Sequence, residues 1–278
     1  MEERFARLPR ALAERTITTR LAERTTPFDD KGVPALLAHP DEGWNDPGVR
    51  PTPRPVVIWM HGRTVSKELD PGRYLRWMRA GIATCSIDLP YHGERADESR
   101  QTSEWTLRLA EQCVQEVDLI LEALGEGRFN GAFDFGRMAI GGMSAGGMVA
   151  LVRLCREHPF VCASVEATAG NFRVMEGHPF YIPALAERMN PIDALEGWRP
   201  IPLLAMHSEA DAWVPFEAMR SFVVELRAHY ARRGAPKVPI ELVMWPETGA
   251  PHEHMGFGRF ANEAKNAQTE FLVRHLKP

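Results

Sequence analysis

The sequence predicts an α/β fold: a mostly parallel central sheet flanked by helices on both faces. Short apolar runs alternate with longer amphipathic runs along the 278 residues. The short runs are almost continuously apolar, which is typical of parallel strands that are covered on both sides. Hydrophobic residues make up 44% of the chain. That content can fill one large core, so residues 1–278 are expected to form a single domain.

The individual elements follow from these two kinds of run. The predicted strands are the short apolar runs at residues 56–60 (VVIWM), 82–87 (IATCSI), 138–141, 161–165 (VCASV), 202–206 (PLLAM) and 240–245 (IELVMW). The predicted helices are the amphipathic runs at residues 72–80, 105–124, 145–156, 216–232 and 259–276. Residues 39–55 are rich in proline and glycine, which interrupt helices and strands alike, and predict a long surface connection. A strand pattern precedes this connection and another follows it at once, so it is not expected to be a domain linker.

Composition and charge argue against several classes of protein. The formal net charge is -4, so no strongly basic face and no nucleic-acid partner are expected. No apolar run approaches the roughly 18 residues of a membrane span, so no membrane association is expected. The charged N-terminus has no apolar signal region, and a cytoplasmic location is expected. The cysteines lack CxxC spacing and are expected to be reduced core residues: Cys85, Cys113, Cys155 and Cys162.

Polar residues follow each predicted strand at the point where it ends. In open α/β sheets, ligands bind beyond the carboxyl ends of the strands, so these residues are expected to share one edge. They include a serine, several carboxylates and several histidines. In chain order they are His61 to Thr64, Asp88 to Gly93, Ser144, Glu166, residues 207–215 (HSEADAWVP) and residues 246–258 (PETGAPHEHMGFG).

Ser144 lies among four glycines in the sequence MAIGGMSAGG, residues 138–147. Residues Gly142 to Gly146 fit the pattern G-x-S-x-G, the nucleophile elbow of a strand-to-helix turn. The serine of such a turn has a strained backbone, and a Cβ two residues before or after it would clash. The amides at the start of the following helix favour negative charge, as in a tetrahedral oxyanion. Ser144 is therefore a candidate nucleophile; a glycine-rich turn without chemistry is the alternative interpretation.

Two other glycine-rich motifs do not fit these residues. A dinucleotide-binding fingerprint needs G-x-G-x-x-G, but Met143 or Ser144 occupies the place of its second glycine, depending on the register. No G-K-[ST] follows, so the turn is not a phosphate-binding P-loop. No organic cofactor is expected.

With these motifs, the chain resembles the α/β-hydrolase superfamily, and is most similar to dienelactone-hydrolase and prolyl-oligopeptidase-like esterases. The resemblance runs from about residue 33 to the C-terminus. It depends on the segments VVIWMHG, IDLPYHGER, GGMSAGG, PLLAMHSEADAWVP and TGAPHEHMGFG, in that order. It implies an α/β-hydrolase fold with a small cap between strands 6 and 7 of the family's sheet. The cap would be residues 170–198, between the predicted strands at 161–165 and 202–206.

The resemblance also implies a catalytic triad in the family's order of nucleophile, acid and histidine. Asp211 would be the acid, with Glu209 as its nearest competitor and Glu166 as a less favoured substitute. The base would be His254 or His252, and the similarity to the family's His-Gly-Phe segment favours His254. A zinc site of the H-E-x-x-H type is not expected, because position 256 is glycine.

The same resemblance suggests the residues around the triad. The backbone N–H groups of Ala145 and of Arg63, or alternatively Thr64, would form the oxyanion hole, and the side chain of His61 would be structural. Arg63 departs from the small or apolar residue often found at this place in the family, and its side chain would either close the site or attract an acidic substrate. Asp88, His92 and Arg95 would anchor loops beneath the site. Apolar residues of the cap would form an acyl pocket or cover the core, namely Phe172, Met175, Phe180, Tyr181 and Met189.

The resulting prediction is a serine carboxylesterase that hydrolyses small to medium carboxylic esters through an acyl-enzyme. A small-molecule ester is the expected partner, without metal or cofactor, and a homodimer is expected only from the frequency of such assemblies. Two alternatives remain: a serine peptidase of the oligopeptidase type with the same triad, and a noncatalytic binding protein with a hydrolase fold.

Overall fold

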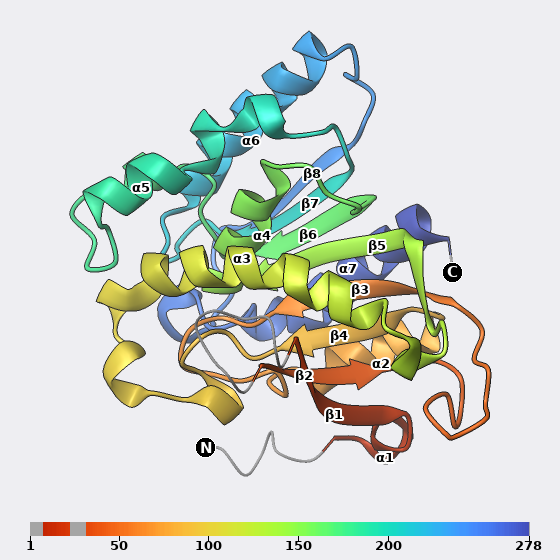
Figure 1. Cartoon of the computed structure of the whole chain (residues 1–278). Coiled ribbons are helices and arrows are strands. Elements are labelled where there is room, and N and C mark those ends of the chain that lie inside the picture. The colour runs from red at the N-terminus through yellow and green to blue at the C-terminus, as the bar shows by residue number, and fades with distance from the viewer. Residues whose placement is uncertain (1–7, 23–31, 278) are drawn as a thin grey trace.

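The computed structural model describes residues 8–22 and 32–277 and contains an eight-stranded sheet within these ranges (Figure 1). The strand order is β1-β2-β4-β3-β5-β6-β7-β8. The pairs β1–β2 and β2–β4 are antiparallel, and every pair from β4 to β8 is parallel. The predicted fold class, a mostly parallel sheet flanked by helices, is confirmed.

The strands are β1 (Thr16–Leu21), β2 (Val33–Ala38), β3 (Arg54–Met60), β4 (Ala83–Ile87), β5 (Phe133–Met143), β6 (Cys162–Glu166), β7 (Leu203–Ser208) and β8 (Ile240–Trp245). The helices are α1 (Arg10–Ala13), α2 (Pro71–Arg79), α3 (Thr106–Leu124), α4 (Ala145–Leu154), α5 (Pro183–Met189), α6 (Phe216–Arg232) and α7 (Ala261–Leu276). All six predicted strands and all five predicted helices are present. The sequence prediction omitted β1 and gave no bounds for the strand pattern before residue 39, which is β2. It placed the start of β5 five residues too late, at Met138 rather than Phe133.

The sheet separates two hydrophobic clusters, one on each face. Along β3, Val56, Ile58 and Met60 belong to the larger cluster, and Val57 and Trp59 belong to the smaller one. The larger cluster contains buried residues of α3, α4, α5 and α6, and the smaller one contains those of α1, α2 and α7. Figure 1 shows α3 and α4 on one side of the sheet and α2 and α7 on the other. This alternation explains why the strands are apolar throughout.

The parallel strands end at one edge of the sheet, and the polar segments predicted for this edge begin there. β5 leads into Ser144, β6 ends at Glu166, and β7 ends at Ser208. Residues 170–198, between β6 and β7, form the helix α5 and short 3-10 turns at Phe172–Met175, Pro191–Asp193 and Leu195–Gly197. The interpretation of this segment as a cap, and of the chain as one domain, stays a prediction.

Three expectations from composition can be compared with the described residues. The four cysteines form no disulfide, and all except the half-buried Cys155 are buried. Among the described residues, no helix is long and apolar enough to cross a membrane. Residues 1–7, on which much of the argument against a secretory signal depends, lie outside the described residues.

Candidate active site

Ser144 occupies the sharp turn between β5 and α4, with φ 52° and ψ -117°. Its amide donates to the carbonyl of Glu166 (2.8 Å), and its own carbonyl accepts from the hydroxyl of Thr168 (2.7 Å). A Cβ on Gly142 would lie 2.4 Å from the carbonyl carbon of Gly146. A positive φ costs a serine free energy, and the surrounding contacts hold it in this conformation. The turn therefore has the geometry of the predicted nucleophile elbow.

Gly146→Ala is expected to destabilise the protein by about 3 kcal/mol, the upper end of the usual cost of overpacking. Its Cβ would lie 2.3 Å from the Met60 carbonyl oxygen and 2.6 Å from that of His61, and neither main-chain atom can move without displacing β3. Chemical denaturation measures the loss. Gly127→Ala is the matched control, because its φ is not positive and nothing lies within 4 Å of the added Cβ. Equal midpoints for the two variants would contradict this account of the elbow.

Ser144, His254 and Asp211 form one chain of hydrogen bonds. Ser144 Oγ lies 2.9 Å from Nε2 of His254, and Nδ1 of His254 lies 2.8 Å from Oδ2 of Asp211. Asp211 and His254 are buried, and Ser144 is partly exposed. With Nδ1 protonated toward Asp211, the unprotonated Nε2 can accept the hydroxyl proton of the serine. The structure thus brings three predicted residues together from three different strand ends.

Asp211 is held as an ionised carboxylate by its surroundings. Its Oδ1 accepts from the amides of Trp213 (2.9 Å) and Val214 (2.8 Å). Burial acts to raise the pKa of Asp211, but hydrogen bonds from His207 and His254 outweigh it, and the pKa lies below its usual value. The contact with His207, 3.4 Å between Nε2 and Oδ2, was not part of the sequence prediction. The two hydrogen bonds from backbone amides hold Oδ1, and they thereby orient Oδ2 toward His254.

His252 lies apart from this chain of hydrogen bonds. It is exposed, its backbone has φ 55°, and its ring stacks on Trp213 with ring centroids 4.8 Å apart. Trp213 also lies 5.0 Å from the ring of His254. The geometry favours His254 over His252 as the base, and the catalytic assignment of either residue stays a prediction. The other predicted competitor for the acid, Glu209, is exposed.

Glu253, between the two histidines, anchors their loop. Its carboxylate accepts from the amide of Thr248 (2.6 Å), the amide of Gly249 (2.6 Å) and the hydroxyl of Ser208 (2.7 Å). The backbone bond from Thr248 is the main reason that the pKa of Glu253 falls to about 2. The sequence analysis missed this role. Nothing in the sequence distinguishes this carboxylate from a solvent-exposed one, because its partner Ser208 ends β7, far away in the chain.

The predicted oxyanion donors lie beside the serine. A Cβ built on Gly62 would lie 3.5 Å from Cβ of Ser144, so the turn after β3 passes directly against the elbow. Among the described residues, the N–H of Arg63 has no hydrogen-bond acceptor. The N–H of Ala145 is the first of α4 and has no partner within the helix. Thr64 is exposed, with φ 66°, and its hydroxyl donates to the Arg63 carbonyl.

The remaining polar residues near the edge are engaged with protein groups. His61 is buried, and its Nε2 accepts from the Leu89 amide (3.0 Å); burial lowers the pKa of His61 to about 3, so its ring is neutral. Asp88 is bound by Lys67. Arg95 donates to Glu116 and to the carbonyls of Asp88 and Leu89. His92 is buried, with Nδ1 2.8 Å from the Pro90 carbonyl. These contacts agree with the expected loop-anchoring role.

Glu166 is paired with a buried arginine of α2 rather than with a histidine. The guanidinium of Arg73 binds both of its carboxylate oxygens, with Nη2 2.9 Å from Oε2. Gln268 of α7 adds a further contact to Glu166 at 3.3 Å. These contacts leave Glu166 unavailable as a substitute acid, and the sequence contained no signal for this ion pair.

The cap residues proposed for substrate binding are mostly buried. Phe172 and Met175 are fully buried, and Phe180 and Met189 are nearly so, whereas Tyr181 is half-buried. The four buried residues belong to the larger core cluster, and Tyr181 packs against it, which favours the core-covering alternative. An acyl-binding role for the set stays a prediction.

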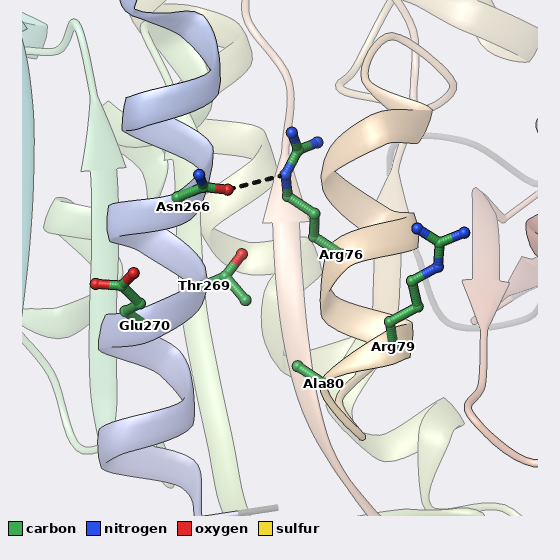
Figure 2. A pocket seen from close by; sticks show the side chains of 6 residues that line it. All are labelled: Arg76, Arg79, Ala80, Asn266, Thr269 and Glu270. Atoms are coloured by element: carbon green, nitrogen blue, oxygen red, sulfur yellow. Dashed lines mark hydrogen bonds between the residues drawn. The ribbon is translucent and has the colours of Figure 1, made fainter.

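A surface depression of about 330 Å³ lies between α2 and α7, away from these residues (Figure 2). Arg76, Arg79, Ala80, Asn266, Thr269 and Glu270 line it. Arg76 reaches across it to the side-chain oxygen of Asn266 (3.2 Å). None of the predicted site residues contributes to this depression, so it is not the candidate active site. Among the described residues, no group of three or more histidine, cysteine and acidic side chains could hold a metal ion.

The chain is similar to known proteins in both sequence and structure. The Escherichia coli (strain K12) protein Esterase YjfP is 28% identical over 263 residues, which cover 88% of this chain and 96% of that protein. A puromycin-hydrolyzing peptidase from Mycobacterium tuberculosis has a similar structure, with a TM-score of 0.70 and 19% identity. The similarity covers 98% of this chain but only 42% of the peptidase. TT1662 from Thermus thermophilus is similar over 95% of this chain and 99% of its own, with a TM-score of 0.66 and 21% identity.

The structural similarities support the fold alone, whereas the sequence defines the family. The sequence pattern of the prolyl oligopeptidase family, Peptidase_S9, matches residues 77–278, from the end of α2 to the C-terminus. This stretch includes Ser144, Asp211 and His254. The chain is therefore a serine hydrolase of the α/β-hydrolase type and belongs to the prolyl oligopeptidase family.

Proposed function

We propose that the protein is a carboxylesterase that hydrolyses small to medium esters with Ser144 as nucleophile. The observation that carries this proposal is the hydrogen-bonded chain from Ser144 through His254 to Asp211 at a strained elbow. Such a chain activates a hydroxyl that is otherwise a weak nucleophile.

The reaction follows from the positions of these groups. Ser144 Oγ attacks the ester carbonyl carbon while its proton passes to Nε2 of His254, and Asp211 stabilises the imidazolium. The N–H groups of Arg63 and Ala145 bind the oxyanion; loss of one such donor typically costs about 3 kcal/mol of transition-state stabilisation. His254 then gives its proton to the leaving alcohol. Water, deprotonated by His254, then attacks the carbonyl carbon of the acyl-enzyme. His254 returns that proton to Ser144 Oγ as the bond to the acyl group breaks, which releases the acid and regenerates Ser144.

An ester substrate is favoured over a peptide by how much of each known protein's length this chain matches. Esterase YjfP is similar along nearly its whole length, whereas the chain spans less than half of the puromycin-hydrolyzing peptidase. The family name favours a serine peptidase as the second candidate. A noncatalytic binding protein is disfavoured, because binding alone requires no strained serine aligned with a histidine.

Ser144→Ala is expected to lower kcat/KM for p-nitrophenyl acetate and butyrate by about 10⁴-fold or more, because it removes the nucleophile. Labelling by a fluorophosphonate should be lost in the same variant. The panel includes p-nitrophenyl octanoate and laurate, which would size the acyl pocket, and a peptidyl p-nitroanilide. Cleavage of the peptidyl substrate without cleavage of any ester would replace the esterase with the peptidase. If the wild type is not labelled by the fluorophosphonate and cleaves none of the substrates, the noncatalytic alternative is favoured.

A further inference from the structure

Arg63 carries a positive charge that no carboxylate of the described residues neutralises. Its Nη1 donates to the carbonyl of Gln101 (2.7 Å) and its Nη2 to the hydroxyl of Ser103 (3.2 Å), both uncharged acceptors. Two other arginines with buried side chains are paired with acids: Arg73 with Glu166, and Arg95 with Glu116. Arg63 itself is half-buried, and burial lowers its pKa without an opposing carboxylate.

The backbone of the residue that carries this uncompensated cation lies next to the reacting centre. Gly62, the preceding residue, lies against Ser144, and consecutive Cα atoms are only about 3.8 Å apart. The Arg63 side chain then extends from the turn after β3 to residues 101–103, just before α3. The nearby acids are engaged elsewhere or exposed: Asp97 pairs with Arg100, Glu94 pairs with Lys67, and Glu98 and Glu104 are exposed without an ion pair to Arg63.

The two hydrogen bonds hold the guanidinium in place and leave some of its N–H donors unbonded. A guanidinium has five N–H donors in one plane, and the bonds to Gln101 and Ser103 engage one on each of two nitrogens. The remaining donors can bind a carboxylate, which accepts two parallel N–H bonds. A partly desolvated cation without a counter-ion also costs free energy, and a bound anion would offset that cost.

We propose that Arg63 binds a carboxylate carried by the substrate, so that acidic esters are preferred over neutral esters of the same shape. This inference rests on the proposed esterase function and names its substrate class. The carboxylate can lie on the acyl part, as in a half-ester of a dicarboxylic acid, or on the leaving alcohol, as in an ester of a hydroxybenzoic acid. In both cases the guanidinium of Arg63 would bind a carboxylate.

Two matched pairs of substrates test the proposal and distinguish these cases. Phenyl hydrogen adipate and phenyl hexanoate differ by a carboxylate on the acyl chain, and 4-acetoxybenzoate and 4-acetoxybenzamide differ by one on the leaving group. The wild type is expected to prefer the acidic member of one pair by about tenfold or more in kcat/KM, the size of one charged hydrogen bond. Arg63→Gln should abolish that preference, mainly through KM. Arg63→Lys should restore part of it.

Ser103→Ala is the matched control, because it removes one anchor of the guanidinium and keeps the charge. It should retain most of the preference, and added salt should weaken the preference of the wild type. Because the readout is a ratio within one protein, a general loss of activity in a variant does not affect it. No preference in the wild type, an unchanged ratio in Arg63→Gln, or an equal loss in Ser103→Ala would overturn the proposal. Failure to cleave the neutral esters as well would instead overturn the proposed esterase function, and this inference with it.

Discussion

Replacing His254 by alanine is expected to lower kcat/KM for p-nitrophenyl butyrate by about 10⁴-fold or more. Nε2 of His254 is 2.9 Å from Ser144 Oγ, and Nδ1 is 2.8 Å from Asp211. Without the imidazole, the serine hydroxyl has no base to take its proton, and the leaving alcohol has no acid to protonate it. Steady-state kinetics of the purified variant measures the loss, and a folded variant is verified by its unfolding midpoint.

His252→Ala is the matched control, two residues away in the same loop. His252 is exposed and stacks on Trp213, and its side chain has no hydrogen bond to Ser144 or Asp211. Its removal is expected to change kcat/KM by less than about tenfold, because Trp213 loses one neighbour while the triad keeps its contacts. Equal losses in the two variants, or a larger loss for His252→Ala, would show that the assignment of His254 as the base is wrong.

The fold could be predicted from the sequence where the pattern is strong and local. The buried parallel strands are runs such as VVIWM, which bury side chains on both faces and therefore stand out. β1 has the sequence TITTRL, and its residues are mostly half-buried at the edge of the sheet. An edge strand does not need a continuous apolar run, so β1 was missed. The first residues of β5, at 133–137 (FDFGR), alternate aromatic and polar or small side chains, and all but Phe133 are exposed or half-buried, so they form no continuous apolar run.

Site residues could be predicted from the sequence where the residues that position them are close neighbours in the chain. Ser144 was identifiable because the glycines that make room for it are its own neighbours. The choice between His252 and His254 depends instead on the path of their loop, which Glu253 fixes through Ser208 on β7, 45 residues earlier. The pairing of Glu166 with Arg73 joins residues 93 positions apart. Neither constraint leaves a local pattern that sequence analysis could read.

Arg73→Met is expected to destabilise the protein by about 3 to 5 kcal/mol, the usual cost of leaving a buried charge unpaired. Arg73 and Glu166 are both almost fully buried, and the guanidinium lies 4.4 Å from the ring centroid of Trp59. Methionine fills similar volume but leaves the carboxylate of Glu166 without its cation. The free energy of unfolding in guanidinium chloride measures the loss. Arg76→Met, one turn further along α2, is the control.

The control should cost about 1 kcal/mol or less, because Arg76 bonds to uncharged groups: the exposed side-chain amides of Asn262 and Asn266 and the carbonyl of Gly72 in its own helix. Figure 2 shows the bond to Asn266. Similar losses for the two arginines would contradict the assignment of a buried charge pair to Arg73.

A second substitution separates the charge from the packing of Arg73. If the unpaired carboxylate causes the loss, Glu166→Gln in the Arg73→Met background should recover most of the stability, because the buried group is then neutral.

Recovery of stability need not restore activity. The Ser144 amide donates to the carbonyl of Glu166, so the end of β6 positions the elbow, and Arg73 positions the end of β6. A double variant that regains stability but keeps a reduced kcat at unchanged KM would identify Arg73 as a positioning residue for Ser144, whereas full activity would limit its role to stability.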